Sequence, residues 1–231
     1  FKKNNITSFS IVQSWDNPTT KGYGVIRPNY TFTWTDLMRE EIAMYQDISL
    51  NRSSAIGSPT FIRQHAAGKT QDILKKKQTL IFATKSPASY KNNIDIAIFL
   101  ALYCENKNLD LEVRLHPLCL LRKSDEFARL KFLSERHKFN LRYADTKNDM
   151  PNLNSEEDNL ACSSNPGDIL VTVYSTMNLE AAYVGLKCIN IDFELTSSVS
   201  RSPRMNMDID RRQLHNQRLL SYGYIYNVNS F

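Results

Sequence analysis

One junction in the sequence combines residue types that suit an anionic ligand. The segment DILVTVYSTMNLEAA, residues 168–182, predicts a buried strand that ends at Tyr174 and a helix that starts at Ser175 and Thr176. Two hydroxyl groups and the free N–H groups of a helix start would meet there, an arrangement that binds phosphate. Glu180 follows one helical turn after Thr176, where it could accept hydrogen bonds from sugar or ribose hydroxyls. Serine is also a common helix cap and glutamate a good helix former, so an ordinary strand–helix turn remains the alternative.

A second polar strand end lies in the segment LEVRLHP, residues 111–117. His116 is expected at the tip of a strand, and Pro117 fixes the backbone directly after it. An imidazole at this place can donate a hydrogen bond to a phosphate oxygen without the full charge of a lysine. Arg114 is expected on the same face of the sheet as His116. Two alternatives stay open: a buried histidine bonded to a backbone carbonyl, and an arginine that packs rather than binds.

A third candidate loop follows the apolar segment TLIFATK, residues 79–85. Lys85, Ser86 and Ser89 would line this loop and could face a phosphate or a sugar, although a plain turn with a capping serine would look the same. Ligands of open parallel sheets lie beyond the carboxyl ends of the strands. Polar loops after several strands of one sheet therefore predict a common site.

The composition is typical of a globular protein that buries a sizeable core. The 231 residues are 42% hydrophobic and 23% charged, with a net charge of +5. This charge suits an anionic ligand or an anionic membrane surface, and the even spread of lysine and arginine argues against a nucleic-acid partner. The four cysteines form no CxxC pair, so neither a zinc site nor a disulfide framework is indicated. Asp208 and Asp210 in the sequence DIDRR are interpreted as the start of a solvated helix rather than as metal ligands.

Strands and helices alternate along the chain, which predicts an α/β fold with a Rossmann-like, doubly wound parallel sheet. Thr35 is expected to cap a helix over residues 36–46, between short strands. We expect residues 1–65 to form the end of an N-terminal domain, 66–78 a linker, and 79–231 a nucleotide-binding domain. Within the last, strands are expected over residues 79–85, 109–116, 139–144, 168–174 and 187–193, and helices over 94–108, 124–138 and 176–185, with a short helix after Ser155.

The motifs RLHP (114–117) and VYSTMNLEAAYVGLKCINID (173–192) resemble the C-terminal domain of GT-B glycosyltransferases of bacterial surface-polysaccharide synthesis. Those enzymes carry an R-x-H-P strand end and an S-[ST]-x-x-x-E-A block, and similar elements occur in polysialyltransferases and in CDP-glycerol glycerophosphotransferases. The N-terminal segments SWDNPTTKG, TFTWTDLMREEI and IGSPTFI are similar to motifs of the same transferases, so the resemblance covers roughly residues 9–227. The aspartate that the family has after its G-x-P-x-F motif is missing here, since Ile62 follows Phe61.

The resemblance implies roles for individual residues. His116, Ser175 and Thr176 would contact the donor phosphates, and Glu180 the donor sugar or ribose. Asp16, beside Trp15, would lie in an inter-domain cleft, and Asp16 and His116 are the candidates for catalysis. The general base of an inverting transferase usually comes from the N-terminal acceptor domain; because most of that domain is missing from a sequence that begins at Phe1, we expect the chain to be part of a longer protein.

The expected function is therefore a metal-independent glycosyltransferase of polysaccharide or capsule biosynthesis, with a nucleotide-sugar donor and no cofactor. Its acceptor would be a glycan or a lipid-linked glycan. We expect a cytoplasmic protein, with peripheral contact at the inner face of the membrane left open. Three other functions also stay open: a CDP-alditol phosphotransferase of the teichoic-acid type, a UDP-sugar 2-epimerase, and a non-catalytic nucleotide-binding module.

Overall fold

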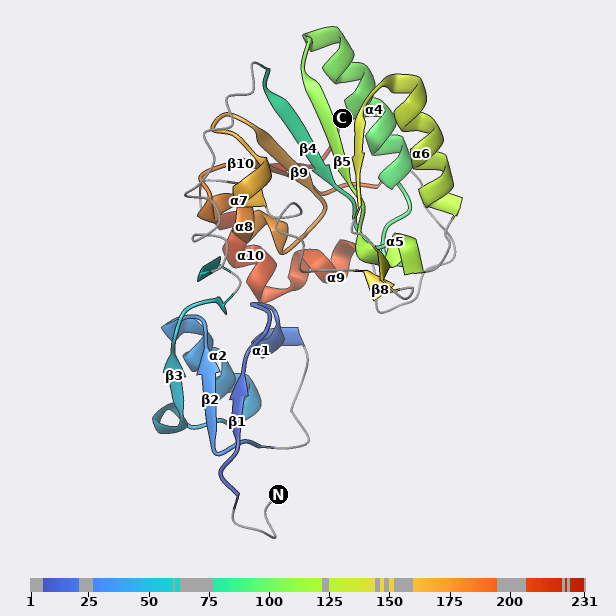
Figure 1. The fold of residues 1–231 in the computed structure, drawn as a ribbon. Coiled ribbons are helices and arrows are strands. Elements are labelled where there is room, and N and C mark those ends of the chain that lie inside the picture. Colours follow the sequence, from blue (N-terminus) through green and yellow to red (C-terminus); the bar gives the residue numbers. More distant parts are fainter. Residues whose placement is uncertain are drawn as a thin grey trace. The chain divides into compact units, whose positions relative to one another are not determined.

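The computed structural model describes residues 6–20, 27–59, 61–62, 77–121, 125–143, 146–147, 150–151, 160–194, 207–221, 223 and 225–230. The chain divides into two compact units (Figure 1). The smaller unit comprises residues 1–66 with 213–215, and the larger unit comprises 67–212 with 216–231. Residues 66–76 of the expected linker lie outside the described residues, as does the expected helix start after Ser155.

The smaller unit is a parallel three-stranded sheet with the strand order β1-β2-β3. Its long helix α2 starts where the sequence predicts, because the Thr35 side chain accepts a hydrogen bond from the Met38 N–H at 3.2 Å. Met38 and Ile42 of this helix are buried. The elements of this unit are β1 (Phe9–Ile11), α1 (Asn17–Thr20), β2 (Tyr30–Thr33), α2 (Asp36–Gln46), a 3₁₀ turn (Leu50–Arg52) and β3 (Ser53–Ala55).

The larger unit contains a six-stranded sheet in which every neighbouring pair of strands is parallel. Its strands are β4 (Thr79–Ala83), β5 (Asp110–Arg114), β6 (Asn140–Arg142), β9 (Ile169–Thr172), β10 (Lys187–Ile191) and β11 (Ile225–Val228), and a small antiparallel pair joins β7 (Thr146–Lys147) to β8 (Met150–Pro151). Its helices are α4 (Asn93–Lys107), α5 (Pro117–Leu121), α6 (Asp125–His137), α7 (Leu160–Ser163), α8 (Met177–Tyr183), α9 (Met207–Arg212) and, from Asn216 on, α10 (Leu214–Ser221).

The order of the strands in this sheet is β11-β10-β9-β4-β5-β6. The chain starts at β4, moves outward through β5 to β6, returns to the other side of β4 with β9, and continues outward through β10 to β11. This is the doubly wound Rossmann order, and the expected fold class is confirmed. The winding reverses between β4 and β9, the point beyond whose carboxyl ends such sheets bind ligands.

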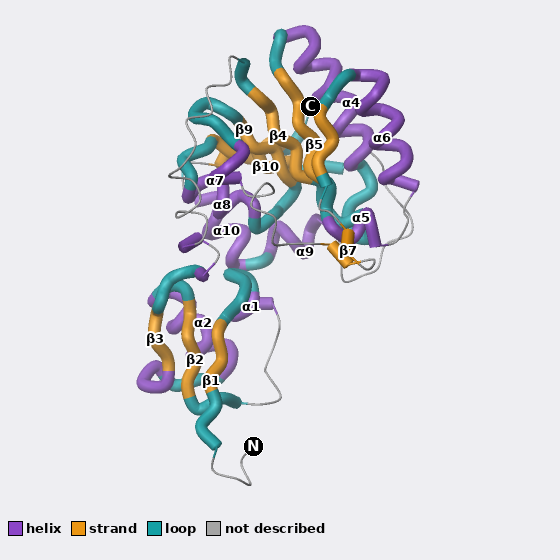
Figure 2. The backbone as a smooth tube through the Cα atoms, viewed as in Figure 1, coloured by secondary structure: helices purple, strands orange, loops and turns teal. Residues whose placement is uncertain are grey.

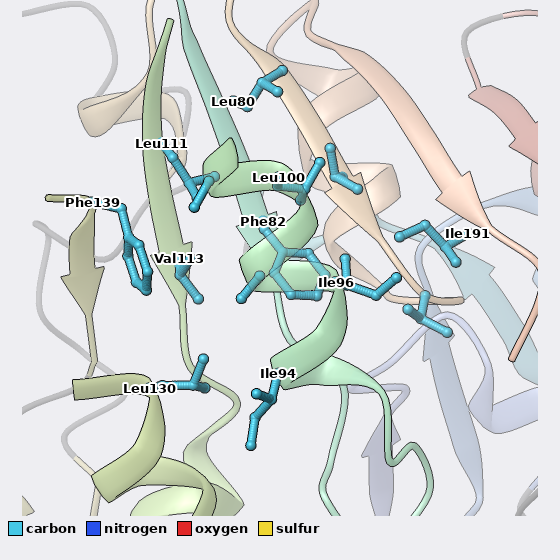
Figure 3. Close-up of a cluster of buried hydrophobic side chains, with 14 of the residues drawn as sticks. Leu80, Phe82, Ile94, Ile96, Leu100, Leu111, Val113, Leu130, Phe139 and Ile191 are labelled. Carbon is cyan, nitrogen blue, oxygen red and sulfur yellow. The ribbon is translucent and has the colours of Figure 1, made fainter. Parts of the chain in front are cut away.

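The core of the larger unit lies between this sheet and the helices α4 and α6. Phe82 of β4 and Ile96 of α4 lie together in a buried apolar cluster, with Leu130 of α6 nearby (Figure 3). Ile81 and Leu170 alternate with residues of that cluster and are also buried, so they point to the opposite face. Helices α7 and α8 lie on that side of the sheet (Figure 2). In the described ranges, no helix is both long and apolar enough to span a bilayer.

A buried carboxylate fixes the strands β4 and β9 to each other at their amino ends. Asp168, which directly precedes β9, accepts a hydrogen bond from the Thr79 N–H at 2.9 Å and another from the Asn165 N–H at 2.8 Å. Only 2% of Asp168 is exposed. Because Thr79 begins β4, this carboxylate joins the two strands between which the winding reverses.

Replacing Asp168 with alanine is expected to destabilise the larger unit by about 1–3 kcal/mol, since two backbone N–H groups would lose their buried acceptor. Both tryptophans of the chain, Trp15 and Trp34, belong to the smaller unit, so urea unfolding should be followed by far-UV circular dichroism rather than by tryptophan fluorescence. The exposed residue Glu135 provides the control. A loss of stability no greater in Asp168→Ala than in Glu135→Ala would contradict this role.

Candidate functional site

The candidate site lies at the carboxyl edge of the six-stranded sheet, around the reversal of winding. The strands β5, β4, β9 and β10 are consecutive neighbours at this edge. The loops after these strands carry, in this order, His116, Lys85, Tyr174 and Asp192. The structure thus brings the three loops predicted from the sequence to one edge. The strand before His116 is β5 and the strand before Ser175 is β9, and only β4 lies between them.

The backbone at Lys85 is fixed by a side chain rather than by a neighbouring strand. Asn93, fully buried at the start of α4, accepts a hydrogen bond from the Lys85 N–H at 3.1 Å and donates one to the Lys85 carbonyl at 2.8 Å. The same amide nitrogen lies 3.0 Å from an oxygen of Glu126, whose pKa is raised by burial. Cys119 also donates to this oxygen, at 3.5 Å, and burial raises the pKa of its thiol to about 12. Asn93 therefore connects the Lys85 loop to α6.

His116 is held as a neutral imidazole at the end of β5. The Leu118 N–H donates to its Nδ1 atom at 3.2 Å, so the ring proton belongs on Nε2. Its own backbone N–H donates to the Thr84 hydroxyl at 2.9 Å, which ties it to the loop after β4. Burial first and the nearby charge of Lys85 second lower the pKa of His116 below its ordinary value of 6.5. At neutral pH the ring is an uncharged hydrogen-bond donor, as the sequence suggested.

Tyr174 adopts a backbone conformation that non-glycine residues rarely occupy. Its φ angle is +47°, in the left-handed region, at the turn between β9 and α8. The Asn190 side chain accepts a hydrogen bond from the Tyr174 N–H at 2.8 Å, and this contact supports the turn. The Lys85 ammonium lies 5.8 Å from the centre of the Tyr174 ring, within the range of a cation–π interaction. Tyr174 thereby joins the loops after β4 and β9 across the reversal point.

The start of α8 offers fewer free N–H groups than the sequence predicts. Helix α8 begins at Met177 rather than at Thr176, and the Ser175 hydroxyl accepts from the Met177 N–H at 3.2 Å. The next N–H groups, of Asn178, Leu179 and Glu180, are bonded to the carbonyls of Ser175 and Thr176. An anion at this edge would depend on side chains more than on the helix start. The Thr176 side chain is exposed and Glu180 is half-buried one turn later.

Three other predicted donor-binding residues take structural positions. Arg114 is buried and forms an ion pair with Glu112 at 2.6 Å, and it also donates to Ser163 of α7. The packing alternative thus describes Arg114, which joins the sheet to α7. Ser86 is buried, and its carbonyl accepts from the N–H groups of Ser89 and Tyr90. It shapes the turn after Lys85, while Pro117 begins the short helix α5.

The sequence did not predict three charged residues at this edge: Asp192, Asp210 and Arg211. Arg211 of α9 donates to the Asp192 carboxylate at 2.6 Å, to the Asp192 carbonyl at 2.8 Å and to Asp208 at 2.7 Å. Asp210 of the same helix forms an ion pair with Lys85. The DIDRR segment is a helix, as expected, but Asp210 is not solvated, because only 21% of its side chain is exposed. The aspartates and arginines of DIDRR are the sequence feature that could have suggested ion pairs. A short polar segment does not, however, indicate which distant residues it pairs with.

Asp16 lies in the smaller unit, where its contacts are local. Its carboxylate accepts from the Thr20 hydroxyl at 3.0 Å and from the Ser14 hydroxyl, and its carbonyl accepts from the Thr20 N–H at 3.0 Å. These bonds shape the turn into α1. The expected place of Asp16 in a cleft stays a prediction. Across the described parts of both units, no group of three or more histidine, cysteine or acidic side chains is arranged to hold a metal ion.

No family model and no curated protein sequence matches the chain. Among solved structures, the UDP-GlcNAc 2-epimerase of Methanocaldococcus jannaschii is similar, with a TM-score of 0.51 and 11% identity over 87% of this chain and 52% of that chain. The structure of this epimerase in complex with UDP-GlcNAc and UDP gives a TM-score of 0.54 and 11% identity over 87% of this chain and 51% of that one. The wall teichoic acid polymerase TagF reaches a TM-score of 0.42 at 15% identity, over 70% of this chain and 39% of its own.

These comparisons concern the fold alone. The identity to the epimerase is 11%, and the TagF likeness, at a TM-score of 0.42, is too weak to support an argument. The chain spans about half the length of the two epimerase chains it matches. The chain therefore shares the parallel α/β fold of these epimerase structures.

The electrostatic coupling between Lys85 and His116 can be measured. Replacing Lys85 with methionine is expected to raise the pKa of His116, because a positive charge that opposes its protonation is removed. The pKa should stay below 6.5, since burial is the larger cause of its depression. NMR titration of the imidazole carbon-bound protons would report both values. Lys107→Met, which alters an exposed lysine at the end of α4, should leave the His116 pKa unchanged, and an equal shift in the two variants would contradict the coupling.

Proposed function

We propose that the carboxyl edge around Lys85 and His116 binds the phosphates of a nucleotide-activated sugar. The observation that carries the proposal is the reversal of winding between β4 and β9, with polar side chains from both neighbouring loops beside it. Sheets of this order bind nucleotides at this point. A cation, a neutral imidazole N–H and the hydroxyls after β9 are groups that suit phosphate oxygens.

The reaction we propose is transfer of the sugar to a glycan or lipid-linked acceptor. In glycosyl transfer the bond from the sugar C1 to the phosphate oxygen breaks, and a bond from C1 to an acceptor oxygen forms. The leaving nucleotide gains negative charge, which Lys85 and the His116 Nε2–H would stabilise without a metal ion. The acceptor proton passes to a general base, which in the transferases that the chain resembles usually comes from the N-terminal acceptor domain.

A UDP-sugar 2-epimerase is the second candidate, and one observation favours it. The two solved structures with TM-scores of 0.51 and 0.54 are both UDP-GlcNAc 2-epimerases. Such an enzyme would use the same phosphate contacts but change the configuration at C2 without any acceptor. A CDP-alditol phosphotransferase and a binding module without turnover would also use this edge, so the reaction must be assigned by experiment.

Ligand binding is the first test. In a thermal-shift screen of CMP, CDP, UDP and GDP, at least one nucleotide is expected to stabilise the 231-residue chain, by about 2.7 kcal/mol at 100 times its Kd. Binding should weaken at higher salt, because the contacts are largely electrostatic. Stabilisation by none of the four would contradict the proposed site.

Removing the imidazole tests its contact with phosphate. His116→Ala is expected to weaken binding of the nucleotide found in the screen by roughly 10–100-fold, the range for a lost hydrogen bond to a charged group. His137→Ala provides the control, since His137 ends α6 just before β6 and therefore lies toward the opposite edge of the sheet. Isothermal titration calorimetry gives both affinities, and circular dichroism verifies folding. Equal affinities in wild type and His116→Ala would exclude His116 from the site.

Turnover separates the candidate reactions. The protein containing this chain should be incubated with UDP-GlcNAc and other nucleotide sugars, first alone and then with glycan acceptors. A transferase shows at most slow donor hydrolysis until an acceptor is added, an epimerase converts the donor alone, and a binding module does neither. Glu180→Ala is expected to lower kcat/KM of the active enzyme by roughly 10–100-fold if Glu180 contacts the donor. An unchanged kcat/KM would leave Glu180 as a helix-surface residue.

A further inference from the structure

The ion pair between Lys85 and Asp210 occupies the place where the donor phosphates are expected. Only 15% of the Lys85 side chain and 21% of the Asp210 side chain are exposed. A charge in such surroundings is stable only with a partner, because both ions have given up most of their water. In this structure the negative partner of Lys85 is supplied by the protein itself.

Helix α9 holds Asp210 in this position through contacts on both of its sides. Met207, at the start of the helix, is buried in the apolar cluster of the larger unit. Arg211 donates to both the carboxylate and the carbonyl of Asp192, directly after β10. The Asn216 side chain donates to the Asp210 carbonyl at 2.8 Å. Helix α9 therefore fixes the position of Asp210 at the carboxyl edge. The ion pair between Asp210 and Lys85 is formed by a side chain whose backbone is held in place.

We infer that Asp210 competes with the ligand phosphate for Lys85. The inference rests on the proposed function for the identity of the ligand. When a phosphate binds, Lys85 exchanges the carboxylate for a phosphate oxygen, and Asp210 pairs with Lys85 again when the nucleotide leaves. Part of the phosphate's interaction energy is spent in breaking the existing pair, so Asp210 weakens binding of the nucleotide product and accelerates its release. In many enzymes product release limits turnover, which gives this weakening a function.

The opposite role of Asp210 makes a distinct prediction. If its carboxylate instead accepted hydrogen bonds from ribose or sugar hydroxyls, its removal would weaken nucleotide binding. If the Asp210 carboxylate competes with the phosphate for Lys85, it weakens nucleotide binding, and its removal must tighten nucleotide binding. The sign of one measured change therefore separates the two roles.

The experiment compares Asp210→Asn with Asp208→Asn. Asparagine keeps the shape of aspartate and removes its charge, and Asp208 provides a matched control because it lies on the same helix, is 67% exposed and pairs with Arg211. Calorimetry should measure the Kd for pyrophosphate, a probe that needs no base or sugar, and for UDP. Asp210→Asn is expected to lower both Kd values roughly 5- to 20-fold, the effect of freeing a partly buried cation. Asp208→Asn should change them less than about 2-fold.

A double-mutant cycle shows whether the gain acts through Lys85. In the background of Lys85→Met, the Asp210→Asn change should no longer tighten pyrophosphate binding, because the competition has been removed. Stopped-flow measurements should show a slower UDP dissociation rate in Asp210→Asn. Should Asp210→Asn fail to fold, Asp210→Ser serves in its place, with the same expected signs.

Several outcomes would overturn the inference: equal or weaker pyrophosphate binding in Asp210→Asn, equal gains in both aspartate variants, or a gain that persists without Lys85. Failure of the proposed function looks different. If the wild-type chain binds none of the four nucleotides but Asp210→Asn binds pyrophosphate through Lys85, the competition is supported and the nucleotide-sugar site is not. If wild type binds a nucleotide and Asp210→Asn binds it no better, the site stands and the competition is wrong.

Discussion

The direction of the six strands constrains everything else in the larger unit. Because all of them are parallel, every strand ends at the same edge of the sheet. The chain winds from β4 toward β6 and then from β9 toward β11, so the loops after the neighbouring strands β4 and β9 lead away in opposite directions. Lys85 and Tyr174 stand at that divergence. The backbone N–H and C=O groups beyond the strand ends have no neighbouring strand to bond to, so polar side chains at this edge serve as their hydrogen-bond partners.

Those partners are mostly amide and hydroxyl side chains from neighbouring elements. Asn93 bonds to both backbone groups of Lys85, Thr84 accepts from the His116 N–H, and Asn190 accepts from the Tyr174 N–H. Neutral side chains support the backbone without adding charge to the edge. Charge is supplied by Lys85 and balanced by Asp210, and the imidazole beside them stays uncharged. A site built in this way can present a cation to an anionic ligand while the surrounding backbone stays fixed.

The sequence predicted the fold class and the strand ends well, because apolar strands and helix-length periodic segments are local signals. Thr35 as the cap of α2 and His116 at the end of β5 are examples. It failed where a role depends on a distant partner. Ser163, a partner of Arg114, lies 49 positions later in the chain, and Lys85, the partner of Asp210, lies 125 positions earlier, so neither contact could be read from the neighbouring residues. The N–H groups of residues 177–180 are bonded within the first turn of α8, so fewer free N–H groups remain there than the sequence suggested.

The support of Tyr174 by Asn190 connects the site to β11 at one edge of the sheet. The Asn190 side chain donates a hydrogen bond to the Asn227 side chain of β11, and Asn227 in turn donates to Asp192. The left-handed turn after β9 is therefore supported by β11 through two asparagine side chains in series. Removing β11 would take away this support, and the backbone at the carboxyl edge would then change two strands away from the strand that was lost.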